Sequence, residues 1–459
     1  MSENESVPLP GRARAPGPTY QEAILRDSSQ PPPSFLEYSY EFFGDEDIPY
    51  TNYISKDYAA AEFEKMWPKV WQMACREEHI SEPGDFYVYD IGELSAILTR
   101  TGSHKIKAYI NACMHRGTAL KQSGSYGFCE TLKCPFHGWE YSLEGELIDL
   151  PEAWDFPHAS AATHSLREIR VDTWGGFVFV NFDQDAEPLL DYLGVLPDHF
   201  RDFGIEDRYT ETHLCKRLPV NWKAAAEAFM EAYHVKETHA GGRDYSEPIT
   251  TYDIFPHNVN RFIHTVGSAN PRMPVQRTEE ELLLELWGRR VPEDGNIPEI
   301  PDGLTARDVY AKIVQEKLGE QYDQDFSNYS TAQTLDSIEY FVFPNFFIFP
   351  GLSLPMAYRF RPDPENPDYS FFDLYFLRPI HPKNAPPPPP EPLILDIADS
   401  YTQAEGLGFL GAVYDQDTSN MAAQTRGFKT CSRGAQTLGN YQECRIRHLH
   451  KRVNDYVKG

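Results

Sequence analysis

Two short pairs of cysteine and histidine lie close together in this chain. Cys113 and His115 are separated by one residue, Cys134 and His137 by two, and eighteen residues lie between the pairs. Two thiolates and two imidazoles at this spacing can hold a [2Fe–2S] cluster, with both sulfurs on one iron and both imidazoles on the other. Histidine ligation raises the reduction potential of such a cluster by several hundred millivolts over an all-cysteine one. The pattern therefore predicts an electron acceptor that passes electrons on.

The alternative for these four residues is a zinc site, because two cysteines and two histidines also suit tetrahedral zinc. The flanking residues favour the cluster. Gly117 and Gly138 follow the two pairs and let the backbone turn, so that N–H groups can approach the sulfurs. Pro135 stiffens the second loop. Cys129 lies near both pairs but outside them, and we interpret it as a small buried residue.

A second group of possible metal ligands lies in a helix-forming run over residues 221–239, which the glycine pair 241–242 is expected to end. Glu231 and His234 are three residues apart and share a helix face. His239 comes five residues after His234, about 140° round an ideal helix. Both imidazoles therefore reach one metal only if the helix widens, kinks or unwinds between them. Two histidines and one carboxylate are typical of non-haem Fe(II) oxygenases, whereas the histidines alone would be interpreted as structural.

The carboxylate of such a set must come from elsewhere in the chain. The best candidate stretch is 413–418, in which Asp415 and Asp417 are two residues apart. On a helix they face opposite ways, so only one of them can bind the metal. The alternative is an ordinary aspartate that caps a helix. Spacing by itself leaves both residues as candidates.

Composition limits the class of protein and its surroundings. A length of 459 residues permits two or three domains. No apolar run approaches a membrane span, and the N-terminus lacks the apolar segment of a signal peptide. Seven cysteines, two of them expected ligands, indicate a reducing compartment without disulfides, hence a cytoplasmic protein. The net charge of −27 disfavours nucleic acid and anionic membranes as partners, and an acidic electron donor would need a local basic patch.

The expected elements divide the chain into a tail and two domains of an α+β protein. Residues 1–34 are rich in proline and polar residues and are expected to be a flexible tail. Residues 65–182 are expected to form a small antiparallel β domain after a short helix that contains Trp67 and Trp71. Its expected strands are 86–89, 95–99, 106–110 and 175–182.

Residues 183–459 are expected to form the second domain, with residues 35–64 packing on it. It alternates helical stretches with strands. The expected helices are 224–234, 279–287, 306–322 and a stretch from 421 onward. The expected strands include 340–343, 346–349 and 371–377.

These residues together resemble the catalytic α subunit of the Rieske non-haem iron oxygenases, the aromatic-ring-hydroxylating dioxygenase family. The resemblance spans about residues 60–455. It rests on the motifs Cys113–Gly117, Cys134–Trp139 and Asn221–Lys223, followed by Glu231, Tyr233-His234 and His239. Gln416-Asp417 matches the position of the family's carboxylate ligand, so the resemblance selects Asp417 over Asp415.

The resemblance implies a fold, cofactors and an assembly. The fold is a Rieske antiparallel β domain plus a helix-grip (START-like) catalytic domain, whose sheet wraps a long helix. The implied ligands are Cys113, His115, Cys134 and His137 for a [2Fe–2S] cluster, and His234, His239 and Asp417 for a mononuclear Fe(II). The implied assembly is a head-to-tail homotrimer, in which the cluster of one copy lies beside the iron of the next.

In this family a carboxylate bridges a cluster histidine to an iron histidine. Here it would be Glu231, between His137 of a neighbouring copy and His234. Relatives such as naphthalene dioxygenase carry Asp at the bridge and one more residue after the preceding Glu, whereas this chain has a shorter gap from Glu227. Glu also occurs in relatives that act on quaternary amines and in many α-only relatives. The departure leaves arene cis-dihydroxylation and the presence of a β subunit open.

The implied activity is oxidation of an aromatic or other apolar small molecule with O2 and NAD(P)H-derived electrons, by ring hydroxylation or dihydroxylation. The alternatives are a monooxygenase that hydroxylates or N-/O-demethylates, including amine substrates; a non-catalytic electron carrier; and a ligand-binding module with a structural metal. The G-x-G-x-x-G motif at 406–411 lacks the βαβ context of a nucleotide site. Electrons must therefore come from a separate ferredoxin and/or flavin reductase. Residues that could line the pocket, or else be sheet core, are Phe229, Phe341, Phe343 and Phe347.

Overall fold

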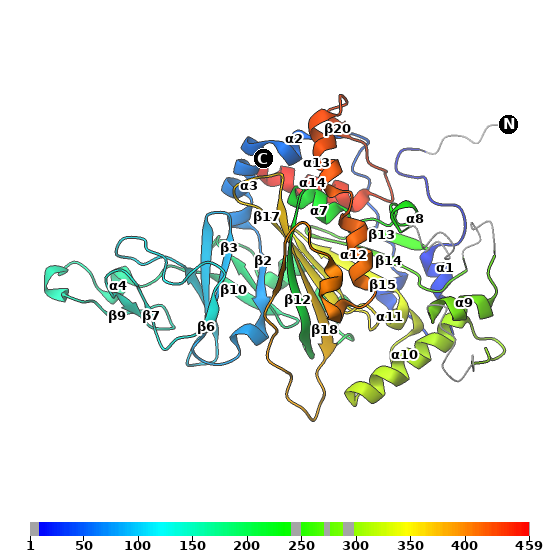
Figure 1. Ribbon diagram of the computed structural model, residues 1–459, viewed down its shortest axis with the longest axis horizontal. Helices are drawn as coiled ribbons and strands as arrows, with labels where there is room; N and C mark the ends of the chain where they lie inside the picture. The colour runs from blue at the N-terminus through cyan, green and yellow to red at the C-terminus, as the bar shows by residue number, and fades with distance from the viewer. Residues whose placement is uncertain (1–8, 240–248, 270–275, 288–297, 459) are drawn as a thin grey trace.

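The computed structural model describes residues 9–239, 249–269, 276–287 and 298–458. Figure 1 shows a β domain that projects to one side of a larger sheet–helix domain, in which a long sheet is covered by helices. The α+β prediction is confirmed. In the part of the chain just defined, no helix is both long and apolar enough to cross a bilayer.

Seven antiparallel strands form the main sheet of the β domain, in the order β2-β11-β10-β5-β4-β3-β6. The expected strands are present, except that Gly175 and Gly176 form the turn between β10 and β11, both at positive φ. The strands are β2 Gln72–Arg76, β3 Asp85–Ile91, β4 Leu94–Arg100, β5 Ile106–Ile110, β6 Tyr126–Phe128, β10 Glu168–Trp174 and β11 Phe177–Asn181.

A small three-stranded antiparallel sheet lies at the tip of the β domain (Figure 1). Its strands are β7 Leu132–Lys133, β8 Glu140–Tyr141 and β9 Leu147–Asp149. Cys134 and His137 lie in the loop between β7 and β8, and Cys113 and His115 lie in the loop after β5. The two pairs thus come from loops of two different sheets, which packing of the tip brings together.

The sheet–helix domain contains an eight-stranded sheet in the order β13-β14-β15-β16-β17-β18-β12-β19. All neighbours are antiparallel except β12 and β19. The strands are β12 Arg208–Leu218, β13 Thr250–Ile254, β14 Val259–His264, β15 Ser337–Val342, β16 Phe346–Phe349, β17 Met356–Pro362, β18 Ser370–Pro379 and β19 Leu393–Leu395. Strands β15, β16 and β18 are the three expected from sequence.

Helices cover one face of this sheet, with α7 over β17 and β18, and α14 over β13 and β14 (Figure 1). Between them lies an aromatic core that includes all four phenylalanines singled out from the sequence. The helices near this face are α7 Trp222–Glu227, α12 Leu410–Thr418, α13 Met421–Thr430 and α14 Cys444–Val457. Helices α9 Glu279–Leu286, α10 Ala306–Tyr322 and α11 Thr331–Leu335 lie at the side of the domain.

The helix expected over residues 221–239 is not continuous. Helix α7 ends at Glu227, and the single-turn helix α8 Val235–Thr238 lies between the two histidines that were expected to share it. In the interruption, the Glu231 carboxylate accepts hydrogen bonds from the backbone N–H groups of Tyr233 and His234. This side chain supplies acceptors that helix carbonyls would otherwise provide, so the chain can leave the helix there. The glycine pair 241–242 lies outside the described residues.

Residues 9–34 pack on the sheet–helix domain, in contrast to the flexible tail that their composition predicted. Helix α1 Tyr20–Ile24 is anchored by the Tyr20 hydroxyl, which donates to Asp336 at 3.0 Å. The Arg307 guanidinium forms ion pairs with both Asp27 and Asp336. The partner surface comes from residues some 300 positions away in the chain, and local composition carries no information about it.

Within residues 35–64, helices α2 Thr51–Ile54 and α3 Lys56–Lys65 contact helices α13 and α14. Glu62 is buried and pairs with Lys223 at the start of α7. The short helix expected to contain both Trp67 and Trp71 ends before Trp71. A 3-10 turn covers Trp67–Lys69 and contains only Trp67.

Candidate cluster and metal sites

The two Cys-His loops adopt the same backbone turn. The carbonyl of Cys113 accepts a hydrogen bond from Gly117 at 2.9 Å, and that of Cys134 accepts one from Gly138 at 3.1 Å. Each cysteine N–H also donates to the carbonyl of the residue after the glycine, at 2.8 Å in both loops. The glycine φ angles are +77° and +76°, which side-chain-bearing residues rarely adopt. The sequence thus builds two equivalent ligand loops.

The two thiols lie side by side in a dry environment. Cys113 and Cys134 are both 3% exposed. Burial raises the pKa of the Cys113 thiol, and the neighbouring Cys134 sulfur raises it further. The Tyr141 hydroxyl lies 3.4 Å from Cys113 Sγ and accepts the N–H of Met114 at 3.0 Å. Tyr141 thus positions this loop and can donate to a thiolate, a role that sequence reasoning missed although it lies two residues after the second motif.

The two imidazoles lie on the outer side of the same loops. The rings of His115 and His137 are 4.7 Å apart, and His115 stacks on Trp139 at 5.0 Å. His115 Nδ1 is inaccessible to solvent and has no hydrogen-bond partner. An orphaned imidazole nitrogen beside two buried thiols fits a bound metal group, because burying an unpaired polar atom is costly.

The ligand atoms of these loops do not gather as closely as a single tetrahedral zinc would require. In a tetrahedral site all ligand atoms lie close to one another. Over the described ranges, the only group of three or more His, Cys, Asp or Glu with all ligand atoms within 4.8 Å is a different one, formed by His234, His239 and Asp417.

His234, His239 and Asp417 come together at the ends of α8 and on α12. Asp417 Oδ1 lies 3.4 Å from His234 Nε2 and 3.1 Å from His239 Nε2. This oxygen is buried and makes no hydrogen bond of acceptable geometry. The break between α7 and α8 allows both imidazoles to face the same carboxylate, as the sequence required. Two nitrogens and an orphaned oxygen that converge in this way fit a divalent cation.

The far nitrogen of each imidazole is held by an oxygen acceptor. His234 Nδ1 lies 2.8 Å from Glu231 Oε1, and His239 Nδ1 lies 2.8 Å from Gln416 Oε1. An ionised carboxylate and an amide oxygen can only accept, so both Nδ1 atoms carry hydrogen, and Nε2 is the atom of each ring that is left to bind a metal in place of a proton. The sequence did not assign a role to Gln416, although it precedes Asp417.

The electrostatics of the set favour a cation. Burial lowers the pKa of His234, but the Asp417 and Glu231 carboxylates outweigh it and raise the pKa to about 10. Asp417 has a lowered pKa, because its two histidines outweigh the effect of burial. Asp415 points elsewhere, since its carboxylate accepts hydrogen bonds from the Ser400 hydroxyl and the Tyr401 N–H. The structure therefore brings Asp417, not Asp415, to the histidines.

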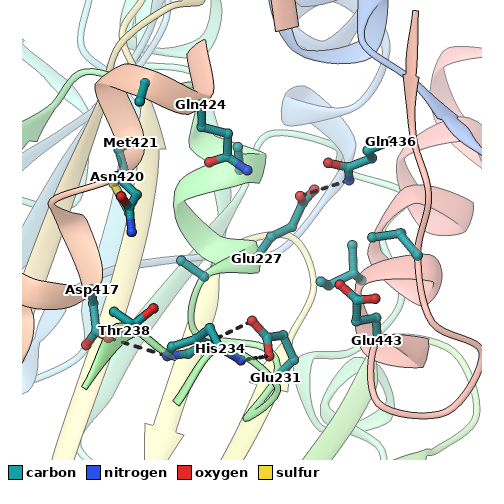
Figure 2. Close-up of a pocket in the computed structure, with 15 residues that line it drawn as sticks. Glu227, Glu231, His234, Thr238, Asp417, Asn420, Met421, Gln424, Gln436 and Glu443 are labelled. Carbon is teal, nitrogen blue, oxygen red and sulfur yellow. Dashed lines mark hydrogen bonds and ion pairs between the residues drawn. The ribbon is translucent and has the colours of Figure 1, made fainter. Parts of the chain in front are cut away.

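A pocket of about 420 Å³ opens beside this set, between α7, α13 and the start of α14 (Figure 2). His234 and Asp417 line one end of it. Besides Asp417, three glutamates line it: Glu227, Glu231 and Glu443. None of the four phenylalanines singled out from the sequence lines it; they belong to the buried core.

Comparison with known families matches both parts of the chain. Residues 70–160 match the Rieske [2Fe-2S] domain, and residues 201–459 match the ring hydroxylating alpha subunit (catalytic domain). The second match covers more than half of the chain. This chain belongs to the ring-hydroxylating α-subunit family. Its Rieske domain is a [2Fe–2S] domain, and its catalytic domain is of the type that binds mononuclear iron.

Curated relatives are about one-third identical to this ring-hydroxylating α-subunit chain over a matched stretch of roughly 200 residues. The chlorobenzene dioxygenase subunit alpha of Cupriavidus sp. (strain PS12) is 33% identical over 197 residues, which are 41% of this chain and 44% of that protein. The large oxygenase component of the naphthalene 1,2-dioxygenase system of Pseudomonas putida is 33% identical over 196 residues, 41% of this chain and 43% of that one. The matched stretch thus spans less than half of these relatives.

Solved structures share the fold over nearly the whole chain. Naphthalene 1,2-dioxygenase with indole bound superposes with a TM-score of 0.64 at 19% identity, covering 91% of this chain and 93% of the other. A quaternary ammonium Rieske monooxygenase in complex with L-carnitine gives 0.62 at 15% identity, covering 89% and 95%. The Rieske and helix-grip architecture implied by the sequence resemblance is thereby confirmed.

Proposed function

We propose that this chain is the catalytic component of an oxygenase that oxidises an aromatic or other apolar small molecule by ring hydroxylation or dihydroxylation. The observation that carries the proposal is the convergence of His234, His239 and Asp417, with both Nδ1 atoms held by oxygens, in a chain that also has a [2Fe–2S] domain. Relatives named for chlorobenzene, benzene and naphthalene support an aromatic substrate.

In this proposal, Cys113, His115, Cys134 and His137 hold the cluster, and His234, His239 and Asp417 hold the iron. When bound, the cluster supplies one-electron transfer and the iron supplies O2 activation at open coordination positions.

The protein fixes the two imidazoles in this arrangement. Glu231 keeps the proton on His234 Nδ1, and Gln416 keeps the proton on His239 Nδ1. The buried aromatic core behind α7 keeps water away from the inner side of the site.

The arrangement of one chain supports a head-to-tail homotrimer. The small β7–β9 sheet lies at the far left of Figure 1, whereas helix α8 lies on the other side of the molecule, within the sheet–helix domain. A neighbouring copy could instead bring its cluster to the Glu231 side of the iron set, so that Glu231 bridges His137 of that copy and His234. We place the domain limits at 65–182 for the Rieske domain and 183–459 for the catalytic domain.

The electrons would come from NAD(P)H through a separate ferredoxin and/or flavin reductase, as expected for an α subunit without its own flavin motif. A β subunit is compatible with the relatives named as alpha subunits. All seven cysteines are free, which supports a cytoplasmic location.

The His234→Ala variant tests the proposal. It should keep the visible absorbance and the electron spin resonance of the reduced cluster, but lose mononuclear iron and turnover with a surrogate reductase and an arene panel. A His381→Ala variant, changed far along the chain from the metal set, should retain both. If His234→Ala still oxidised substrate, the iron assignment would be wrong.

Isotope labelling separates the two oxygenase reactions. Dihydroxylation should place both atoms of ¹⁸O2 in one product molecule. Incorporation of a single atom, or demethylation of an amine or ether in the panel, would instead assign a monooxygenase.

A further inference from the structure

One exposed cation lies next to the cluster loops without a carboxylate partner. Arg116 directly follows His115 and is exposed at the tip of the Rieske domain. Its guanidinium lies over the Phe136 ring at 5.3 Å and makes no ion pair with any residue that the structure describes. Phe136 is 57% exposed and Met114 is 39% exposed. The tip thus presents a positive charge flanked by apolar side chains.

The pocket beside the metal set has the opposite character. Of its three glutamates, Glu227 accepts hydrogen bonds from Tyr53 and Gln436 and lies 2.7 Å from His450. Glu231 is bound by the His234 loop.

Among these glutamates, Glu443 is the one whose carboxylate contacts no cationic side chain of the described residues directly. It accepts only the N–H of Gly439 and has no ion pair within the described ranges. Burial raises the pKa of Glu443, and the charges of Glu231 and Glu227 raise it further, while the Gly439 N–H and the Arg447 guanidinium oppose the rise only in part. A second cation, paired directly with Glu443, would relieve the repulsion among the three glutamates.

We propose that the tip of one copy docks into this pocket of the next, with Arg116 paired to Glu443. The pairing deepens the proposed head-to-tail assembly and depends on it. If Glu231 receives His137 of the neighbouring copy, the residues around that histidine must enter the same pocket, because Glu231 and Glu443 both line it. Arg116 is then the cation that reaches its wall.

The apolar surfaces match as well. On the tip, Phe136 lies against the guanidinium, and Met114 is exposed two residues before Arg116. In the pocket, the apolar lining residues are Met421, Leu438 and Ile446. Apolar surface around a charge pair excludes water and strengthens the pair. Arg116 and Glu443 are positioning residues, because their pairing fixes how the cluster of one copy faces the iron ligands of the next. Charge complementarity of this kind sets register and association more than raw affinity.

Single charge reversals give the first test, with the iron-loaded and cluster-loaded enzyme. Arg116→Glu and Glu443→Arg should each lower the trimer fraction in sedimentation velocity. Each should also slow reoxidation of the reduced cluster in a single turnover by about tenfold or more. The Glu320→Arg control changes an exposed carboxylate on α10 by the same charge and should leave both readouts as in wild type. Unchanged assembly and reoxidation in both single variants would overturn the pairing.

The double variant Arg116→Glu/Glu443→Arg supplies the decisive comparison, because it recreates the pair with reversed charges. In the double variant, the trimer fraction and the reoxidation rate should both be much closer to wild type than they would be if the losses of the two single variants multiplied. If the effects simply multiplied, the two residues would not be partners. Wild-type enzyme that neither assembled nor reoxidised its cluster would contradict the proposed function itself, so the two failures are distinguishable.

A small cation is the competing occupant of the pocket. Isothermal titration of wild type with tetramethylammonium chloride should show no saturable binding. Binding that the Glu443→Gln variant abolished, with the trimer fraction unchanged, would assign the pocket to a cationic ligand and overturn the proposal.

Discussion

At the scale of single residues, the oxygen acceptors behind the imidazoles decide what the histidines can do. Glu231 and Gln416 each hold one Nδ1–H, one with a full charge and one with a neutral amide. A neutral imidazole with a fixed tautomer is the form that binds a metal through Nε2. The asymmetry leaves His234 with the stronger acceptor, on the side that faces the pocket.

Replacing Gln416 by Leu should weaken iron binding while the cluster stays intact. Loss of the acceptor frees the His239 ring to rotate and to change tautomer. Removing a residue that hydrogen-bonds to a metal ligand typically lowers metal affinity about ten- to hundredfold. Iron affinity measured by competition with a chelator, alongside cluster absorbance, checks this. Gln424→Leu, which changes an amide on α13 that makes no hydrogen bond to either histidine, should keep the wild-type affinity. Equal loss in both variants would contradict the role of Gln416.

At the scale of elements, two kinds of turn build the sites. The cluster loops need a left-handed glycine after each Cys-His pair, so that the chain folds back on the cysteine carbonyl. The segment that carries His234 and His239 needs a break in regular structure. Helix α7 ends at Glu227, and the two histidines lie at either end of the short helix α8. Ligand geometry is therefore a property of where these elements end.

The Gly117→Ala substitution should destabilise the first cluster loop. No atom lies within 4 Å of the added Cβ, so the penalty comes from the φ of +77° alone, about 1–2 kcal/mol. We expect fewer clusters per chain, measured by iron and sulfide analysis, and a lower thermal midpoint. Gly427→Ala on α13 is the matched control, with equally open space but no left-handed backbone. It should be neutral or stabilising; a loss of clusters there as well would count against backbone strain as the cause.

At the scale of the whole molecule, a buried arginine joins the two domains. Arg359 on β17 donates to the Met73 and Ala74 carbonyls of β2 in the Rieske domain, and pairs with Asp373 at 3.0 Å. It is 3% exposed. The orientation of the cluster-bearing tip thus depends on a charge that the catalytic sheet supplies.

The Arg359→Met variant should lose about 3 kcal/mol of stability, because it leaves two strand carbonyls and part of the Asp373 charge buried without partners. Thermal unfolding followed by cluster absorbance and tryptophan fluorescence measures the loss. The control Arg378→Met removes a pair with Glu211 on the same sheet, in which both side chains are partly exposed. That loss should stay below about 1 kcal/mol. A similar cost for both variants would show that the buried contacts contribute nothing beyond an exposed pair.

The sequence predicted most of what is local. Four strands of the β domain (β3, β4, β5 and β11), three strands of the catalytic sheet and helices α9 and α10 followed from periodicity, because a strand or helix shows its pattern within one segment. The ligands in the cluster loops could be predicted for the same reason, since Cys113 and His115, like Cys134 and His137, lie within a few residues of each other. The Pro-rich segment 9–34 misled the prediction, because its anchors Asp336 and Arg307 lie far along the chain.

By itself the sequence determined the kinds of ligand and the chemistry they permit: thiolates with imidazoles in one place, imidazoles with a carboxylate in another. Spacing left Asp415 and Asp417 as equal candidates until the family resemblance selected Asp417, which is the one that faces the histidines. Only the tertiary structure decided that Gln416 holds His239 and that Glu443 shares a pocket with Glu231. The physical reason is distance along the chain. About 180 residues separate His239 from Gln416, and packing of α12 and α14 on the sheet, not any local pattern, brings such segments together.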